Sequence, residues 1–183
     1  GVITGRAIGE IHCAEPSIVE GSNEFLTKLF NTQQLSDLIK EKLTWSINSK
    51  DSLSKTYKEW LTSSLVKVLR RYSNAIDLAS SDRVLLHGDC KPSNIKKSNI
   101  QDRAVVFDWE FSFVGPRLVD IGHFLRWGVS DHFIGQFTSH YQKVTGVDLS
   151  RKFQVAKLID LVNLSFQLAK SIDGSEREKD ILN

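Results

Sequence analysis

Apolar residues recur at helical spacing through most of the chain. Near its start Ile3, Ala7, Ile8 and Ile11 fall on one face, so a helix is expected over 3–13. A longer helix is expected over 53–77, because one apolar stripe there contains Leu53, Tyr57, Trp60, Leu61, Leu65, Val68, Leu69 and Tyr72. We interpret that stripe as core packing.

Helical spacing also predicts the remaining helices, over 24–30, 33–42, 117–127, 131–144, 150–170 and 175–182. Gly146 is a suitable C-cap for the helix over 131–144. The stretches 15–23 and 44–51 are polar and irregular. Helices therefore dominate the predicted fold.

Short β-branched and apolar runs lie in the middle of the chain. They predict strands over 83–86, 95–97 and 104–107, with turn-like residues at 99–102. Together they indicate a small hairpin whose ends bring Asp89 and Asp108 close to each other, and Gly115-Pro116 breaks the chain after it. The predicted fold class is α+β, mostly helical, with a small β-hairpin that carries polar residues.

The composition is that of a globular protein. Its 183 residues suit one domain or one large lobe, and a net charge of +2 gives no reason to expect nucleic acid or a membrane as a partner. Cys13 and Cys90 lie far apart and form no disulfide framework, so a cytoplasmic location is the simplest expectation. The chain has no Met and begins directly in a helical pattern, which suggests part of a longer protein.

The stretch 84–120 concentrates the residues that could carry chemistry. Mg²⁺ is usually held by one or two carboxylates together with substrate phosphates, and Asn94 and Asp108 supply suitable oxygens. Asp89 could orient a substrate hydroxyl and accept its proton, and Lys91 could contact a transferring phosphate. This combination suits phosphoryl transfer.

Motifs in a fixed order give this stretch a family resemblance. Residues 87–94, HGDCKPSN, match the H-x-D-x-x-x-x-N catalytic loop of the protein-kinase-like fold. Glycine in second place is typical of the aminoglycoside phosphotransferase and choline kinase-like family. Residues 107–110, FDWE, resemble its D-W-E motif, and residues 115–122, GPRLVDIG, resemble the segment that follows. The opening helix also resembles the first helix of that family's large lobe.

The resemblance implies a role for each polar residue of the stretch. Asp89 resembles the catalytic base, and Asn94 and Asp108 resemble the ligands that hold Mg²⁺ with the co-substrate ATP. Lys91 departs from the family's usual residue. Both a catalytic contact with phosphate and a solvated surface charge therefore stay open for it.

Other residues resemble structural supports of the loop. His87 corresponds to the residue that braces it, and Asp120 to the buried aspartate that anchors it. Gly88 stands where protein kinases have the arginine that reads a phosphorylated activation loop. Control by such a phosphorylation is therefore not expected.

The resemblance also predicts the domain organisation. Residues 1–183 would form a kinase-like C-terminal lobe, with the catalytic and metal loop at 84–120 and a helical substrate subdomain at 22–80 and 129–183. No Gly-rich loop or strand lysine can be placed upstream of the catalytic loop. The N-terminal β lobe is therefore missing from these residues and is expected in cis.

Two functions of different classes follow. The first is an ATP-dependent phosphotransferase that moves the γ-phosphoryl group to a hydroxyl of a small molecule. The second is a non-catalytic kinase-like binding module, or an inactive fragment without the nucleotide-binding lobe. Acidic residues near the C-terminus could bind a cationic substrate, but a solvated helix face is the stronger interpretation for Asp160, Asp173, Glu176 and Glu178.

Overall fold

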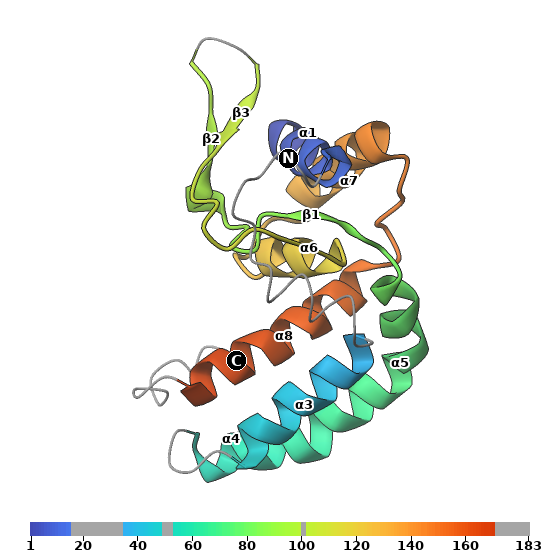
Figure 1. Cartoon of the computed structure of the whole chain (residues 1–183), viewed down its shortest axis with the longest axis vertical. Coiled ribbons are helices and arrows are strands. Elements are labelled where there is room, and N and C mark those ends of the chain that lie inside the picture. The colour runs from blue at the N-terminus through green and yellow to red at the C-terminus, as the bar shows by residue number, and fades with distance from the viewer. Residues whose placement is uncertain (16–34, 49–52, 100–101, 171–183) are drawn as a thin grey trace.

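The computed structural model describes residues 1–15, 35–48, 53–99 and 102–170. The helices expected over 24–30 and 175–182 lie outside these residues, as do Asp173, Glu176 and Glu178. The described parts are mostly helical and contain two two-stranded antiparallel sheets, in which β1 pairs with β4 and β2 with β3. The β2–β3 hairpin projects from one end of the molecule (Figure 1). The predicted fold class, α+β and mostly helical with a small hairpin, is confirmed. Each helix in these residues is too short or too polar to cross a membrane.

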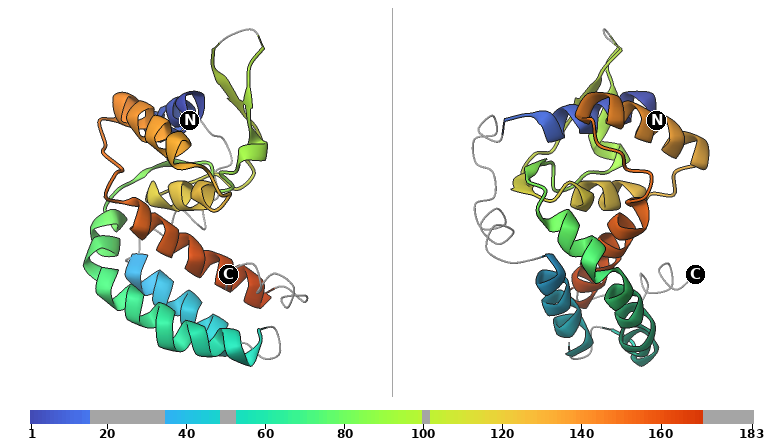
Figure 2. Two further views of the ribbon diagram at one scale, coloured as in Figure 1. Left: turned by 180° about the vertical axis from the view of Figure 1, so that it is seen from behind. Right: turned by 90° about the vertical axis from the view of Figure 1, so that its right-hand side faces the viewer.

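Helices α1 (Val2–Cys13) and α7 (Asp131–Thr145) lie side by side, as the views of Figures 1 and 2 agree. Both were predicted from their apolar spacing, and Gly146 ends α7 in the left-handed conformation, with φ of 72°. Their backbones approach closely at Gly5, where an added Cβ would lie 2.3 Å from the carbonyl oxygen of Phe137. The absence of a side chain at Gly5 therefore sets the distance between the two helices.

This close approach gives a testable contrast between two helical glycines. Gly5→Ala should destabilise the protein by about 1–3 kcal/mol, because the new methyl group has no room against α7. Gly135→Ala, at a position where a Cβ would have no neighbour within 4 Å, should instead stabilise it by about 0.5–1 kcal/mol. Urea unfolding of both variants measures the difference. Equal effects of the two substitutions would contradict the packing described at Gly5.

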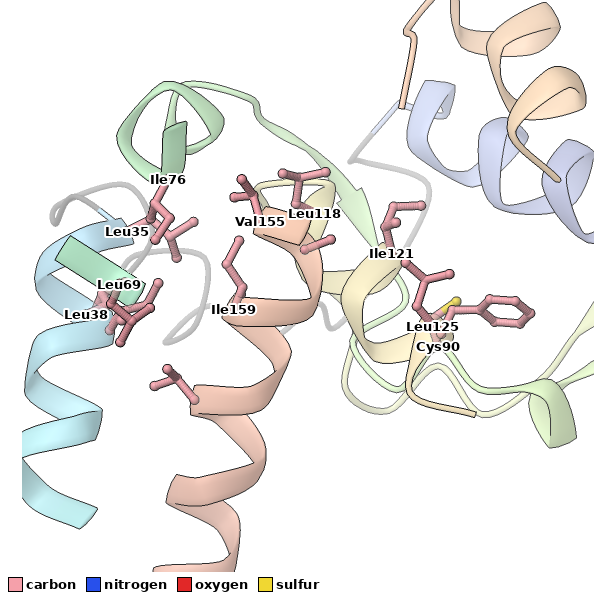
Figure 3. Packing of buried hydrophobic residues seen from close by; sticks show 14 of the residues in the cluster. Leu35, Leu38, Leu69, Ile76, Cys90, Leu118, Ile121, Leu125, Val155 and Ile159 are labelled. Carbon is pink, nitrogen blue, oxygen red and sulfur yellow. The ribbon is translucent and has the colours of Figure 1, made fainter. Parts of the chain in front are cut away.

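The other half of the molecule is a layer of long helices. Helix α3 (Leu35–Asn48), the helical run of α4 (Lys55–Trp60), η2 (Leu61–Leu65) and α5 (Val66–Ser80), and α8 (Phe153–Lys170) pack against one another. Figure 3 shows how the core continues from this layer into α6 (Leu118–Leu125). At one end Leu35 lies beside Ile76, and Leu69 lies beside Leu38. Ile159 lies between this end and α6, where Ile121 and Leu125 extend the apolar cluster toward Cys90.

The long helix expected over 53–77 is interrupted by the π-helical turn Leu61–Leu65. Its buried residues Tyr57, Leu61, Leu65 and Leu69 are spaced four apart, and on an α-helix such spacing drifts around the axis by about 40° per step. The wider π turn absorbs part of this drift and keeps the four on one face. Val68, expected in the apolar stripe, is 39% exposed, and its assignment to the core was wrong.

Helix α3 also differs from the prediction, because it extends into the stretch expected to be irregular and ends at Asn48. Polar residues of low helix propensity made this stretch look irregular. In the structure the Ser46 hydroxyl donates to the carbonyl of Lys42 at 2.8 Å, and Trp45 packs edge-on against Phe166 with ring centroids 5.1 Å apart. Tertiary packing has overridden local propensity here.

The strands hold the stretch 84–120 in place. Predicted strands are observed as β1 (Val84–Leu86), β2 (Ile95–Lys97) and β3 (Ala104–Val106), and β2 and β3 form the predicted hairpin. Strand β4 (Phe113–Gly115) was not predicted; it pairs with β1. The break expected at Gly115-Pro116 coincides with the end of β4, and α6 begins shortly after it. The candidate residues thus follow β1 and β3 and precede α6.

Candidate active site

The polar loop begins where β1 ends. All three residues of β1 are buried, so the strand is fixed in the core and the loop leaves it from a defined point. Gly88 follows with φ of +80°, and a Cβ there would lie 2.0 Å from the carbonyl oxygen of Phe111. Only glycine suits this backbone conformation and this close approach. The bend directs Asp89 away from the strand.

Asp120, in the first turn of α6, accepts hydrogen bonds from the backbone of this loop. Its Oδ2 accepts from the N–H of His87 at 2.7 Å and its Oδ1 from the N–H of Gly88 at 3.0 Å. The side chain is 1% exposed. Burial alone would raise the pKa of Asp120, but His12 and the two backbone donors hold it below its usual value. An ionised carboxylate therefore fixes the start of the loop, which is the geometry that the predicted anchoring role requires.

A series of hydrogen bonds from other helices fixes the position of Asp120. His12 Nε2 lies 3.4 Å from Asp120 Oδ2, and His12 Nδ1 lies 2.7 Å from the hydroxyl of Tyr141. That hydroxyl accepts from Arg117, which also pairs with Asp82. Sequence analysis missed this series. His12 lies more than a hundred positions from both Asp120 and Tyr141, and no local pattern marks these contacts.

The imidazole of His87 connects the loop to the residue before Asp108. Its Nε2 donates to the carbonyl of Phe107 at 2.6 Å, and its Nδ1 accepts from the N–H of Asp89 at 3.3 Å. The N–H of Phe107 in turn donates to the carbonyl of Asn94 at 2.9 Å. These contacts place Asn94 beside Phe107, the residue before Asp108. The predicted closeness of Asp89 and Asp108 stays a prediction.

Asp108 itself has φ of +68°, and it is the only non-glycine residue with positive φ in the described parts of the chain. Aspartate tolerates the left-handed region better than most residues, at a cost in backbone energy. The side chain is exposed. The backbone turn thus presents a carboxylate at the surface directly after β3.

Asp89 lies at the centre of the site. Its Oδ2 accepts from Lys91 Nζ at 2.5 Å and from Asn94 Nδ2 at 3.2 Å, and its Oδ1 lies 3.3 Å from His123 Nε2. Burial would raise the pKa of Asp89, but the hydrogen bonds and charges of these neighbours bring it below its usual value. The carboxylate is therefore ionised at neutral pH and available to accept a hydrogen bond.

Lys91 contacts Asp89 rather than extending freely into solvent, although its side chain is 30% exposed. The hydrogen bond to Asp89 and the charges of Asp89, Asp108 and Glu110 raise the pKa of Lys91. Its cation therefore lies in the field of the site's carboxylates. That position is compatible with a phosphate contact, and the catalytic role of Lys91 stays a prediction.

His123 and Asp160 also lie next to Asp89 and its neighbours, although no sequence pattern placed them there. Asp160, on α8, is 6% exposed and forms a bidentate pair with Arg126 at 2.8 and 2.6 Å. The interpretation of Asp160 as part of a solvated face was therefore wrong. Cys90, next to Asp89, is buried, and burial raises the pKa of its thiol well above the usual value. Cys13 and Cys90 are both free.

The donor set around Asn94 and Asp108 fits Mg²⁺. Asn94 turns its Nδ2 toward Asp89. Its amide oxygen accepts from the Ser93 hydroxyl at 3.4 Å and has a second lone pair that a metal ion could use. One amide oxygen and one carboxylate, completed by water and phosphate oxygens, is a usual set for Mg²⁺.

The sequence model of the phosphotransferase enzyme family matches residues 4–152. The chain belongs to this family. The match includes the loop after β1, the hairpin, β4 and α6, so the site described above lies within the family's shared region. No curated protein has a sequence that matches this chain significantly.

Solved structures of phosphotransferases share the fold. The choline kinase LicA from Streptococcus pneumoniae superposes with a TM-score of 0.60 at 17% identity, over 98% of this chain and 62% of that one. An aminoglycoside phosphotransferase from Alicyclobacillus acidocaldarius subsp. acidocaldarius DSM 446 superposes with a TM-score of 0.54 at 16% identity, over 99% of this chain and 59% of that one. This chain thus spans about three fifths of their lengths, as a large kinase-like lobe would. At such identities the likeness establishes the fold.

Proposed function

We propose that this phosphotransferase transfers the γ-phosphoryl group of ATP to a hydroxyl group of a small molecule. The observation that carries the proposal is the ionised Asp89 carboxylate, held by Lys91, Asn94 and His123 on a loop anchored by Asp120. Phosphoryl transfer depends mainly on positioning and on neutralising charge. A preorganised carboxylate beside a cation and two oxygen ligands supplies both.

In the proposed reaction Asp89 hydrogen-bonds the acceptor hydroxyl. The acceptor O–H bond breaks and its proton passes to Asp89, while the acceptor oxygen bonds the γ-phosphorus. The bond from phosphorus to the bridging oxygen breaks, and its electron pair remains on ADP. Because the pKa of Asp89 is low, the carboxylate orients the hydroxyl in the ground state and takes the proton late in the transfer.

Asn94 and Asp108 would hold Mg²⁺ through one amide oxygen and one carboxylate oxygen. The bound ion would neutralise charge on the nucleotide phosphates. Lys91, in the field of Asp89, Asp108 and Glu110, would add a point charge that a phosphate oxygen can meet.

A bound nucleotide also needs protein contacts on its other side, and we propose that a further lobe of the same polypeptide supplies them. Supporting this, the side chains of Val105, Phe107 and Phe111, before and after Asp108, are 45%, 49% and 47% exposed. Aromatic and aliphatic side chains that are this exposed are suited to pack against another segment of protein. The two solved relatives are each longer than this chain by a substantial part.

The proposed function is tested with the full-length protein, Mg²⁺ and γ-labelled ATP. Candidate acceptors are aminoglycosides, macrolides, choline, homoserine and sugars, and the label should appear on one of these classes. A parallel reaction without Mg²⁺ should give none. Absence of transfer to every acceptor, together with absence of nucleotide binding by calorimetry, would favour the alternative of a non-catalytic binding module.

Asp108→Asn should raise the Mg²⁺ concentration needed to bind nucleotide by about tenfold or more, because a neutral amide replaces the only carboxylate among the proposed ligands. The readout is the rise in melting temperature that ATP produces at a series of Mg²⁺ concentrations. Asp131→Asn, an exposed aspartate at the start of α7, is the control and should leave the curve in place. An unchanged Mg²⁺ requirement in Asp108→Asn would remove Asp108 from the site.

A further inference from the structure

Among the described residues, three side-chain nitrogens contact the Asp89 carboxylate, and they are divided unequally between its two oxygens. Oδ2 is contacted by Lys91 Nζ at 2.5 Å and by Asn94 Nδ2 at 3.2 Å. Oδ1 is contacted by His123 Nε2 at 3.3 Å. A carboxylate oxygen offers about two lone-pair directions. Oδ2 therefore has both directions in use, and Oδ1 keeps one direction free.

The free direction on Oδ1 is where an acceptor hydroxyl can hydrogen-bond. His123 occupies the other direction of the same oxygen, so the hydroxyl would bind next to its imidazole. Without His123 the carboxylate would keep its two contacts on Oδ2, but Oδ1 would have no fixed partner among the described residues. The direction in which it accepts the hydroxyl would then be less defined.

The structure holds His123 in this position from the opposite side. Helix α6 approaches α8 closely at Gly122, where a Cβ would lie 2.2 Å from the carbonyl oxygen of Ala156 and 3.1 Å from Cβ of Asp160. This approach brings Asp160 Oδ1 to 3.9 Å from His123 Nδ1. Asp160 is in turn fixed by its bidentate pair with Arg126. The imidazole is thus enclosed between Asp89 and an ion pair, and its side chain is 15% exposed.

We propose that His123 is a positioning residue for phosphoryl transfer, whose Nε2 holds Oδ1 of Asp89 so that its remaining lone pair points at the acceptor hydroxyl. The proposal rests on the proposed function, because it assigns a task within that reaction. Asp160 and Arg126 keep the imidazole in place. Burial and the charge of Arg126 lower the pKa of His123, against the opposite effects of Asp160, Asp89 and Asp120. The imidazole is therefore neutral at neutral pH, and in the proposed role its Nε2–H donates to Asp89 Oδ1 across the 3.3 Å contact.

Two amide substitutions separate this role from simple packing. In His123→Gln the amide nitrogen reaches about as far as Nε2 and can still donate to Asp89. In His123→Asn the amide nitrogen stands where Nδ1 was, on the side of Asp160. We expect kcat to fall about tenfold in His123→Asn, as for the loss of one hydrogen bond to a charged group, and to stay within about threefold of the wild type in His123→Gln. The KM for ATP should be unchanged in both.

His132→Asn is the matched control, since this histidine is exposed on α7, and its kcat should equal that of the wild type. Melting temperatures of all variants establish that each is folded. Equal losses in His123→Gln and His123→Asn would overturn the proposal, because a structural role does not distinguish the two amides. Wild-type kcat in His123→Asn would overturn it as well.

A spectroscopic measurement separates this inference from the proposed function. The imidazole nitrogen chemical shifts of His123 should report a protonated Nε2 at neutral pH, and the Nε2 shift should change in Asp89→Ala. Shifts that are the same in wild type and Asp89→Ala would show that the contact does not form, and would overturn the inference even in an active enzyme. Absence of phosphoryl transfer by the wild type would instead contradict the proposed function, whatever the shifts show.

Discussion

Asp89→Asn should lower the rate of phosphoryl transfer about a thousandfold, within the range expected for removal of a catalytic base. Asparagine has nearly the same shape, but it carries no charge and cannot take the proton of the acceptor hydroxyl. Lys91 loses its partner in this variant, yet its side chain is 30% exposed, so water can replace the lost contact at little cost in stability. The fold should therefore be retained while catalysis is lost.

The rate is measured under saturating ATP and acceptor, with the melting temperature as a check of folding. Asp102→Asn is the matched control. Asp102 is 70% exposed and lies 3.6 Å from Lys97 in the hairpin, so its neutralisation should leave the rate unchanged. A wild-type rate in Asp89→Asn would show that Asp89 is not the base, and the proposed function would then need another residue to orient the hydroxyl.

The pH dependence of the rate follows from the same environment. Lys91, His123 and Asn94 bring the pKa of Asp89 below its usual value, against the effect of burial. The base is in its active, ionised form above that pKa. Titration of Asp89 therefore does not limit the rate near neutral pH.

Local sequence patterns predicted the elements that are determined by residues close together in the sequence. Helix α7 follows from its apolar spacing and from Gly146, and the β2–β3 hairpin follows from two β-branched runs that pair with each other. The stretch 84–120 was located in the same way, because its polar residues lie next to short strands. The large-lobe resemblance was likewise readable from motifs close together in sequence, and the family match confirms it.

Elements defined by distant contacts were missed. Strand β4 has three residues and exists because β1, about thirty residues earlier in the chain, offers it a partner; so short a strand has little local signal. Asp160 looked like a residue on a solvated face, and only the packing of α8 against α6 shows it paired with Arg126. His12 and Tyr141 support Asp120 from two helices that meet only in the folded protein. The polar networks behind the site therefore required the structure.

Asp120→Ala should destabilise the protein by about 3–5 kcal/mol, the cost of removing one partner from a buried charged cluster. The substitution leaves the N–H groups of His87 and Gly88 without their acceptor in a site that is 1% exposed. Asp120→Asn keeps one carbonyl oxygen and should lose roughly half as much. The measurement is the urea midpoint at neutral pH. Asp37→Ala is the control, since that side chain is 56% exposed and should change stability by no more than about 0.5 kcal/mol.

Asp120→Ala should also change how the stability of the fold depends on acidic pH. The pKa of Asp120 in the folded protein is below its ordinary value of 3.8, so its ionised form stabilises the fold above that value, and the stabilisation is lost as the pH falls through the folded pKa. The stability difference between wild type and Asp120→Ala should therefore be constant near neutral pH and shrink below about pH 4. A difference that grows on acidification would mean that Asp120 is protonated in the native state. The N–H groups of His87 and Gly88 would then donate to a neutral carboxylic acid, and the proposed catalytic loop would not be anchored by an ionised carboxylate.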